Sequence, residues 1–262
     1  MSAVRQPPSL SAAAYRRVID QRLREWDQLD EYASRTRDIP TARVVFVLAA
    51  TAHNMARGAV HLWDGGFLVE SMPNVRTCFE ACVSAAWTQQ TGRRGVEAYL
   101  YERARQSQVI LRQLDEAGHA VPDAVRETVD TAPLLAQPPQ LRDRARSIQA
   151  MCRDLDYSAG LYLMYRELSD EAHTSIGLIR HLARTPEDDL VHLAQPRHGQ
   201  HADTLATFAV ACALIWAGRA FSEVSLHKPH KRALRAAAQE LGVPHILTAA
   251  SSPRPPRTRS GS

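Results

Sequence analysis

The chain has 262 residues, and its 45% hydrophobic content is enough for one large helical domain, or two small ones, with a substantial core. The formal net charge is +4, but four arginines lie near the ends: Arg5, Arg254, Arg257 and Arg259. Without them the body is neutral overall. It therefore lacks the global positive charge of a dedicated nucleic-acid-binding protein, although a local basic patch is still compatible with the sequence.

Helical periodicity predicts the elements in chain order: 11–36, 41–63, 68–91, 94–117, 140–182, 201–227 and 230–241, separated by Pro and Gly. Pro73 marks a first turn or a kink, and the stretch from Tyr157 to Gly160 divides the long fifth segment into two. Val191 to Leu193 can form a short extended piece, but not a sheet. We expect an all-α fold: a single bundle of about seven helices over 11–248, with disordered tails at 1–10 and 249–262.

The distribution of apolar residues predicts which helices are central. Segment 41–63 is apolar on nearly every side, so we expect it to be the central helix, with 201–227 as its neighbour. Segments 11–36 and 94–117 have a charged face and are expected on the outside.

Four cysteines lie in apolar helical stretches, which predicts reduced, buried thiols: Cys78, Cys82, Cys152 and Cys212. Cys78 and Cys82 share a helix face, but no second pair with metal-ligand spacing accompanies them, so we expect no metal and no cofactor. The N-terminus lacks a signal-peptide pattern, and the longest uncharged apolar run, 205–218, is short for a bilayer. A cytoplasmic protein without membrane association is the expectation.

The segment that follows Leu161 carries the best candidate for chemistry. Tyr162, Arg166, Ser169 and His173 form a polar file beside an apolar file that includes Tyr165. Arg166 and His173 are two helical turns apart and point the same way, so both can reach one bound anion. A His can exchange a proton near neutral pH while an Arg holds a phosphate, a combination that suits metal-independent RNA cleavage.

The simpler interpretation of this file is structural. In that case His173 hydrogen-bonds across the bundle, and Arg166 pairs with a nearby carboxylate from Glu167, Asp170 or Glu171.

Two other helices carry polar residues beside apolar faces. Arg76 and Glu80, at i and i+4, flank an apolar face and are expected to be partly buried. They form either a structural ion pair or an anion site in which Glu80 orients a neighbouring Arg or His. On the second segment His53, Asn54 and Arg57 are either satisfied core and rim residues or a cationic wall of the cavity that Arg76 and His173 face.

The stretches Arg76-Thr-Cys-Phe-Glu80 and Tyr165-Arg-Glu-Leu-Ser169-Asp-Glu-Ala-His173 resemble two motifs of a bacterial family of uncharacterised all-helical proteins. These motifs are Arg-[Ser/Thr]-x-x-Glu and Tyr-x-x-Leu-Ser-x-x-x-His, and the resemblance covers roughly residues 40–185. That family is similar to the HEPN superfamily, whose active members carry an Arg, four to six residues, then a His, and act as dimeric metal-independent ribonucleases in toxin and antiviral systems. The resemblance implies that Arg166 and His173 take these two positions, with RNA as substrate and a homodimer as the assembly.

Other HEPN-like proteins are inactive scaffolds or nucleotide binders, so three hypotheses stay open. The first is a dimeric endoribonuclease in which Arg166 binds phosphate and His173 is the general base and acid. The second is a noncatalytic module in which Arg76, Glu80, His53 and His173 hold a small anionic ligand or fix a partner surface. The third is a purely structural interaction protein.

Overall fold

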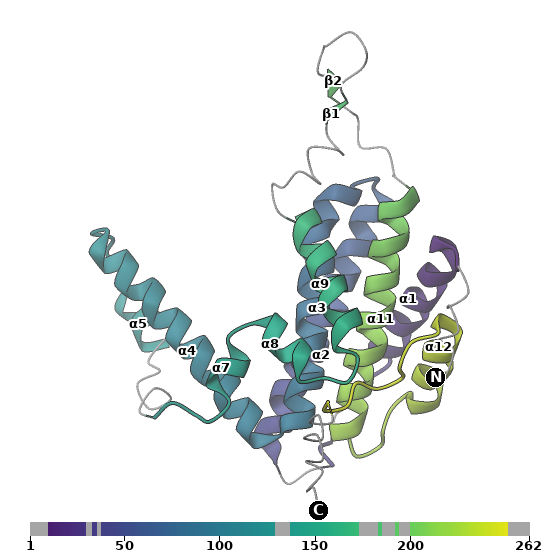
Figure 1. Cartoon of the computed structure of the whole chain (residues 1–262). Helices are drawn as coiled ribbons and strands as arrows, with labels where there is room; N and C mark the ends of the chain where they lie inside the picture. The colour runs from purple at the N-terminus through teal and green to yellow at the C-terminus, as the bar shows by residue number, and fades with distance from the viewer. Residues whose placement is uncertain are drawn as a thin grey trace, which may run out of the picture.

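A computed structural model describes residues 10–29, 33–35, 38–128, 137–172, 183–184, 192–193 and 200–250. The helices in these ranges are α1 (Ala12–Asp27), α2 (Ile39–Asp64), α3 (Leu68–Thr91), α4 (Arg93–Glu116), α5 (Asp123–Thr128), α7 (Arg142–Ala145), α8 (Ile148–Arg153), α9 (Ser158–Ala172), α11 (Gln200–Val224) and α12 (Lys231–Leu241) (Figure 1). The predicted all-α fold is confirmed.

Two very short strands accompany the helices. β1 (Ala183–Arg184) pairs antiparallel with β2 (His192–Leu193). The extended piece predicted near His192 is therefore present, but it does have a strand partner. A ladder of two residues per strand does not change the fold class.

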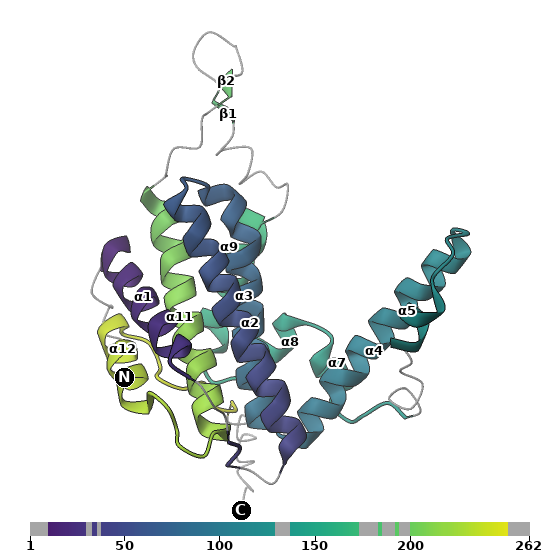
Figure 2. The same cartoon turned by 180° about the vertical axis from the view of Figure 1, so that it is seen from behind.

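The centre of the bundle is α3, and the prediction that segment 41–63 is central was wrong. α3 packs between α2 and α11 and also contacts α4, α8 and α9 (Figures 1 and 2). Its polar Ser84 and Thr88 are buried, whereas Val47 of α2 is 59% exposed. The sequence misled because small hydroxyl residues fit a crowded interior, while the apolar residues of α2 include a buried face rich in alanine and larger residues on an exposed face.

The second core helix is α11. Every residue from Ala209 to Ala217 is buried, and the helix packs on α1, α2, α3 and α12. Within the described part of the chain, Thr204–Val224 is the one stretch long and apolar enough to cross a membrane by length and composition, and 83% of its most apolar window is buried in the fold. Its apolar character therefore matches its place in the core.

Two predicted helices differ from the structure in their bounds or divisions. α1 ends at Asp27, and Ser34 forms an antiparallel bridge with Ser225 at the end of α11. Over its described part, 140–172, the predicted 140–182 helix is α7, α8 and α9, and residues 173–182 lie outside the described residues. The predicted division near Tyr157 is confirmed, but a further break occurs where the Ser147 side chain accepts a hydrogen bond from the Ala150 N–H and caps α8.

The described chain ends in a non-helical segment, residues 243–250, that packs on the α8–α9 turn, and we call this segment the strap. Leu247 is 2% exposed, Thr248 donates to Asp156 from its N–H and its hydroxyl, and the Ala250 N–H donates to the Asp154 carbonyl. The expected disordered tail therefore begins too early at 249, because hydrogen bonds hold Ala249 and Ala250 against the bundle. The predicted tail residues 1–9 and 251–262 lie outside the described residues.

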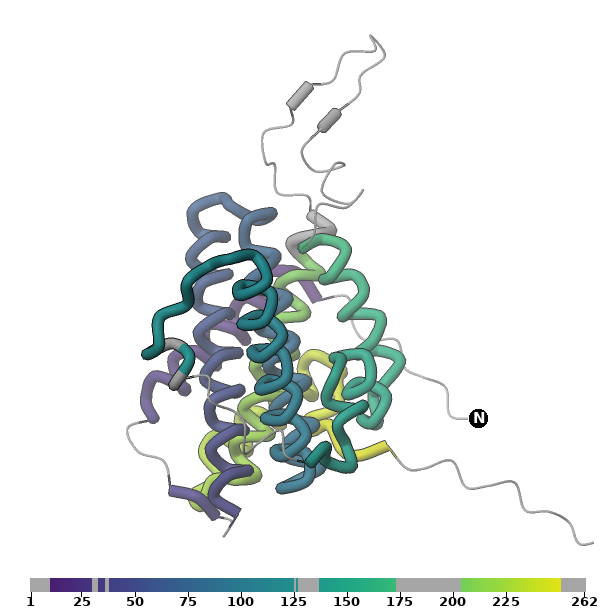
Figure 3. Tube along the Cα trace, turned by 90° about the vertical axis from the view of Figure 1, so that its left-hand side faces the viewer, coloured from purple at the N-terminus to yellow at the C-terminus, as the bar shows by residue number. Residues whose placement is uncertain are grey.

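The α4 helix extends away from the bundle as an arm, with α5 against its distal half (Figures 1 and 2). Figure 3 views the molecule with this arm toward the reader. The first half of α4 packs on α3 and α7 and buries Val96, Ala98 and Ala104. Arg126 of α5 forms an ion pair with Asp115 on the distal half. The prediction of 94–117 as an outer helix is consistent with this position.

Candidate functional site

The two motif stretches lie on adjacent helices, α3 and α9. Arg76 Nε donates to Glu80 Oε1 at 2.8 Å, and the Arg76 guanidinium lies 5.7 Å from the centroid of the Tyr165 ring. The side chains of Arg76 and Glu80 are 22% and 31% exposed. Arg76 therefore contacts both its own helix and α9, and the half-buried ion pair lies at the seam between the two helices.

Two other residues of the second motif make contacts within the fold. Leu168 is fully buried, and the Ser169 hydroxyl donates to the Tyr165 carbonyl at 2.8 Å. His173 lies outside the described residues, so its role stays a prediction.

Arg166 occupies a different face of α9 and is exposed to solvent. A hydrogen bond with the Tyr162 side chain, one turn earlier, raises the pKa of Arg166, and the charges of Asp170 and Glu167 add to this effect. The arginine is therefore fully charged and accessible, as a phosphate-binding residue requires.

His53, Asn54 and Arg57 make their described contacts toward α1. The His53 ring stacks on Trp26 with centroids 3.9 Å apart, and its Nδ1 hydrogen-bonds the Ala49 carbonyl at 2.7 Å. Burial lowers the pKa of His53 to about 4, so the ring is neutral at physiological pH. Arg57 donates to Asn54 and forms an ion pair with Asp27. None of these contacts joins the three residues to Arg76, Glu80 or Tyr165.

A polar groove begins beside the motif residues and continues toward α7. It consists of two adjoining cavities of about 250 and 180 Å³ that share Glu102 and Arg146. Glu80 and Tyr165 line its first part. We call it the α4–α7 groove, and its other charged and aromatic residues are Tyr99, Tyr101, Arg103, Arg105 and Arg142.

The α4–α7 groove has more positive than negative side chains. Glu102 is almost fully buried and accepts two hydrogen bonds from Arg105, at 2.6 and 2.9 Å. Arg105, with help from the charge of Arg146, lowers the pKa of Glu102. Arg103 lies 5.2 Å from the centroid of the Tyr99 ring.

Arg142 and Arg146 lie 3.4 and 4.0 Å from the same carboxylate, Asp143. Glu80 is already paired to Arg76. The nearby carboxylates of Glu102 and Asp143 are therefore outnumbered by the four groove arginines, which are Arg103, Arg105, Arg142 and Arg146.

Sequence reasoning missed this groove. Its signal was present as Arg142-Asp-Arg144-Ala-Arg146 and as the Tyr and Arg residues between 99 and 105. Both runs fit the solvated face of an outer helix equally well, and only the packing of α4 against α7 brings them together.

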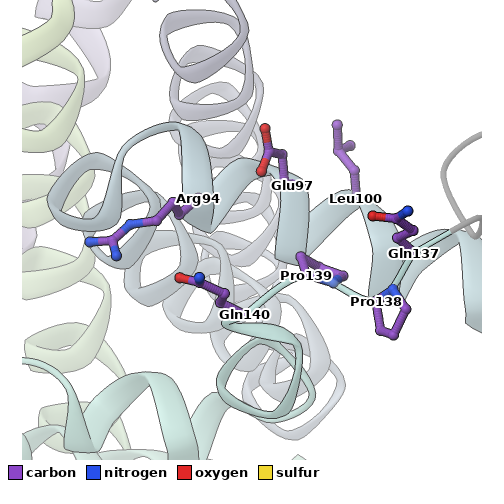
Figure 4. Close-up of a pocket in the computed structure, with 7 residues that line it drawn as sticks. All are labelled: Arg94, Glu97, Leu100, Gln137, Pro138, Pro139 and Gln140. Carbon is purple, nitrogen blue, oxygen red and sulfur yellow. The ribbon is translucent and has the colours of Figure 1, made fainter.

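A larger cavity of about 540 Å³ lies further along, between α4 and the segment 137–140. Its lining residues are Arg94, Glu97, Leu100, Gln137, Pro138, Pro139 and Gln140 (Figure 4). Figure 4 shows these side chains spread over the cavity walls rather than converging on one point. We therefore place the candidate site in the α4–α7 groove.

The four cysteines are free and buried, as predicted. Burial raises the pKa of Cys78 and of Cys152 to about 12, so these thiols stay protonated. In the ranges that the structure describes, no group of three or more His, Cys, Asp or Glu side chains has the geometry to hold a metal ion.

These features define an all-helical protein whose motif-bearing helices meet at a polar groove. The chain belongs to a family of unknown function (DUF5677), whose model matches residues 42–190. The matched region begins in α2 and includes α3, α4, α7 and α9, so it contains every side chain of the groove. No curated protein and no solved structure matches the chain.

Proposed function

We propose that the protein is a HEPN-like, metal-independent endoribonuclease of a bacterial toxin or defence system, acting as a homodimer in the cytoplasm. Arg166 binds the scissile phosphate, and His173 transfers the proton. The alternative is a noncatalytic binding protein, which one observation favours.

The observation that carries the proposal is the α4–α7 groove. A nucleic-acid strand presents one negative charge per phosphate and flat bases that stack on aromatic rings. The exposed Arg103, Arg142 and Arg146 supply cations, and Tyr99 and Tyr101 supply rings along the same groove. The groove therefore has a local excess of positive charge, although the body of the chain is neutral overall.

The chemistry needs only the RNA and the two named side chains. His173 accepts the proton of the ribose 2′-hydroxyl, and the 2′-oxygen attacks the adjacent phosphorus. The bond to the 5′-oxygen breaks, that oxygen takes the proton that His173 accepted, and the products are a 2′,3′-cyclic phosphate and a 5′-hydroxyl with His173 neutral again. Arg166 stabilises the negative charge that builds up on the nonbridging phosphate oxygens.

The test is incubation of the purified full chain with mixed RNA in EDTA. Wild-type protein is expected to cleave the RNA and leave 2′,3′-cyclic phosphate ends. His173→Ala and Arg166→Ala are each expected to slow cleavage by about 100-fold or more, with unchanged helical circular dichroism. Arg112→Ala is the matched control, because Arg112 is an exposed arginine on the distal half of α4. Unchanged cleavage by His173→Ala would refute the nuclease.

The second candidate is a noncatalytic binding or scaffold protein, with RNA or a small anion as ligand. It is favoured by the contacts of Arg76, whose guanidinium is already engaged by Glu80 and by the Tyr165 ring. Binding of labelled single-stranded RNA by wild type, weakened in Arg146→Gln but not in Arg112→Gln, with no cleavage by wild type, is the result expected for this candidate.

A further inference from the structure

Arg22 of α1 is a buried arginine with donors that no described residue satisfies. Its side chain is 2% exposed, and Nη2 donates to Glu25 Oε1 at 2.7 Å. Nε and Nη1 are also buried, and neither has a hydrogen-bond partner among the described residues. Burial lowers the pKa of Arg22, against the opposing effect of Glu25. Buried guanidinium donors are normally all paired, so these two unpaired nitrogens indicate a missing acceptor.

A crevice lies beside this guanidinium. Arg22, Trp26, His53, Phe221, His230 and Leu234 are among the side chains that line it. Its volume is about 20 Å³, and one water molecule needs about 10–15 Å³ of such space. The crevice therefore accepts a single atom the size of a water oxygen or a chloride ion, and it is too small for a phosphate group.

The start of α12 closes the crevice. His230 precedes the first residue of this helix, and its side chain makes no capping hydrogen bond. The first N–H groups of a helix carry partial positive charge, which favours an anion. The adjoining Pro229 has no N–H and also lines the crevice.

The charges around the start of α12 are predominantly positive. Glu25 also lines the crevice. Its Oε1 accepts hydrogen bonds from Arg22 and Gln21, and its Oε2 lies 3.6 Å from His230 Nδ1. His53 is neutral because burial lowers its pKa to about 4.

A second buried arginine repeats the pattern on α11. Arg219 donates from Nη2 to Glu223 Oε1 at 2.6 Å, and its buried Nε and Nη1 have no partner among the described residues. Lys228 and Lys231 lie 3.9 Å from the same glutamate. Of these charged groups, Arg22 and Glu25 line the crevice itself. Counted with the Arg219 group, four cations accompany two carboxylates, Glu25 and Glu223.

We propose that the crevice at Arg22 binds one small monovalent anion of halide size, with chloride as the physiological ligand. The anion accepts hydrogen bonds from Arg22 and ties α1 to the start of α12. This site is on the α1 side of the bundle and does not depend on the proposed function of the α4–α7 groove.

Crystals of the full chain grown in sodium bromide test the site directly. The expected result is an anomalous bromide peak within hydrogen-bonding distance of Arg22 Nε or Nη1, because bromide replaces chloride at nearly the same size. An ordered water only, with no anomalous signal at Arg22, would overturn the proposal.

Thermal unfolding gives a second measurement. At constant ionic strength, replacing gluconate by chloride is expected to raise the Tm of the wild type by about 2–4 °C and then to saturate. Arg22→Met removes this dependence, whereas Arg24→Met, an exposed arginine on the same helix, retains it. Equal chloride dependence in the wild type and in Arg22→Met would contradict the site. If Arg22→Met does not fold, the bromide experiment on the wild type decides alone.

Discussion

His53 shows how burial changes the protonation of a single residue. Its ring is enclosed between Trp26 and the α2 backbone, and the Ala49 carbonyl fixes Nδ1 as the protonated nitrogen of the neutral ring. A histidinium at this position would place a charge in the core beside Arg22 and Arg57, both of which lower the pKa further. His53 therefore packs as an aromatic residue rather than acting as a proton-transfer group.

The pKa of His53 predicts how stability depends on pH. In the unfolded chain His53 has its ordinary pKa of 6.5, and in the folded protein about 4. The unfolded state therefore binds the proton first, and the free energy of unfolding falls as the pH drops from 6.5 toward 4, by up to about 1.4 kcal/mol per pH unit. Urea unfolding at pH 7.5 and 5.5 is the measurement.

Wild type is expected to lose about 1.4 kcal/mol more than His53→Gln between these two pH values, because the variant has no group to protonate there. His61→Gln, on the exposed side of α2, should behave like the wild type. Parallel pH dependences for wild type and His53→Gln would mean that His53 is protonated in the folded protein.

At the scale of elements, the contact between α3 and α9 connects the two motif stretches. α9 packs on α3, and Leu161 and Leu168 of α9 are fully buried in the core. Arg76 and Tyr165 add a cation–π contact between the two helices. The apolar residues bring the helices together, and the polar pair favours one register.

A double-mutant cycle measures this polar contact. Arg76→Met and Tyr165→Leu are expected to couple by about 0.5–1 kcal/mol in the free energy of unfolding, because the contact is partly exposed. Arg112→Met combined with Tyr165→Leu is the control pair and should be additive. A coupling of zero in the first cycle would show that the two side chains do not interact in solution.

The helices most accurately predicted from sequence are those with clear boundary residues. The predicted 68–91 segment coincides with α3, which ends before Gly92, and α12 ends before Gly242, whose backbone has φ of 67°. The prediction divided the 140–182 segment one time too few, because the cap at Ser147, which starts α8, is a local signal that periodicity does not register.

The candidate site was only partly predictable, because some of its residues are brought together by helix packing rather than by a motif. Arg76, Glu80 and Tyr165 were identified from their motifs, and the structure brings these three together. The groove arginines were not identified, because their proximity depends on how α4 packs against α7. Arg22 was missed although it falls on the face that Val18, Ile19 and Trp26 define, which is a periodic signal for burial.

At the scale of the whole molecule, segments distant in sequence complete the core. The Ser34–Ser225 bridge joins the α1–α2 linker to the end of α11, and the Leu155–Ala249 bridge joins the α8–α9 turn to the C-terminal strap. Trp216 of α11 donates to the Pro244 carbonyl at 2.7 Å. The strap is therefore part of the fold.

Leu247 in the strap gives a direct test of this view. Leu247→Ala is expected to lower the free energy of unfolding by about 2–5 kcal/mol, the usual cost of truncating a fully buried leucine. Leu226→Ala is the control, because Leu226 is 52% exposed and should cost about 0.5 kcal/mol or less. Denaturant unfolding monitored by tryptophan fluorescence measures both, and equal effects would show that the strap does not pack in solution.

The position of α11 has a consequence for the order in which the protein can fold during synthesis. The family match ends at residue 190, yet α3 within it buries one side against α11, which is made later. The α2–α3 hairpin can form on the ribosome, but its apolar side has no partner while translation continues at about 5–20 residues per second. A nascent chain of this protein therefore exposes an unfinished hydrophobic surface for several seconds, and that interval is when chaperones would engage it.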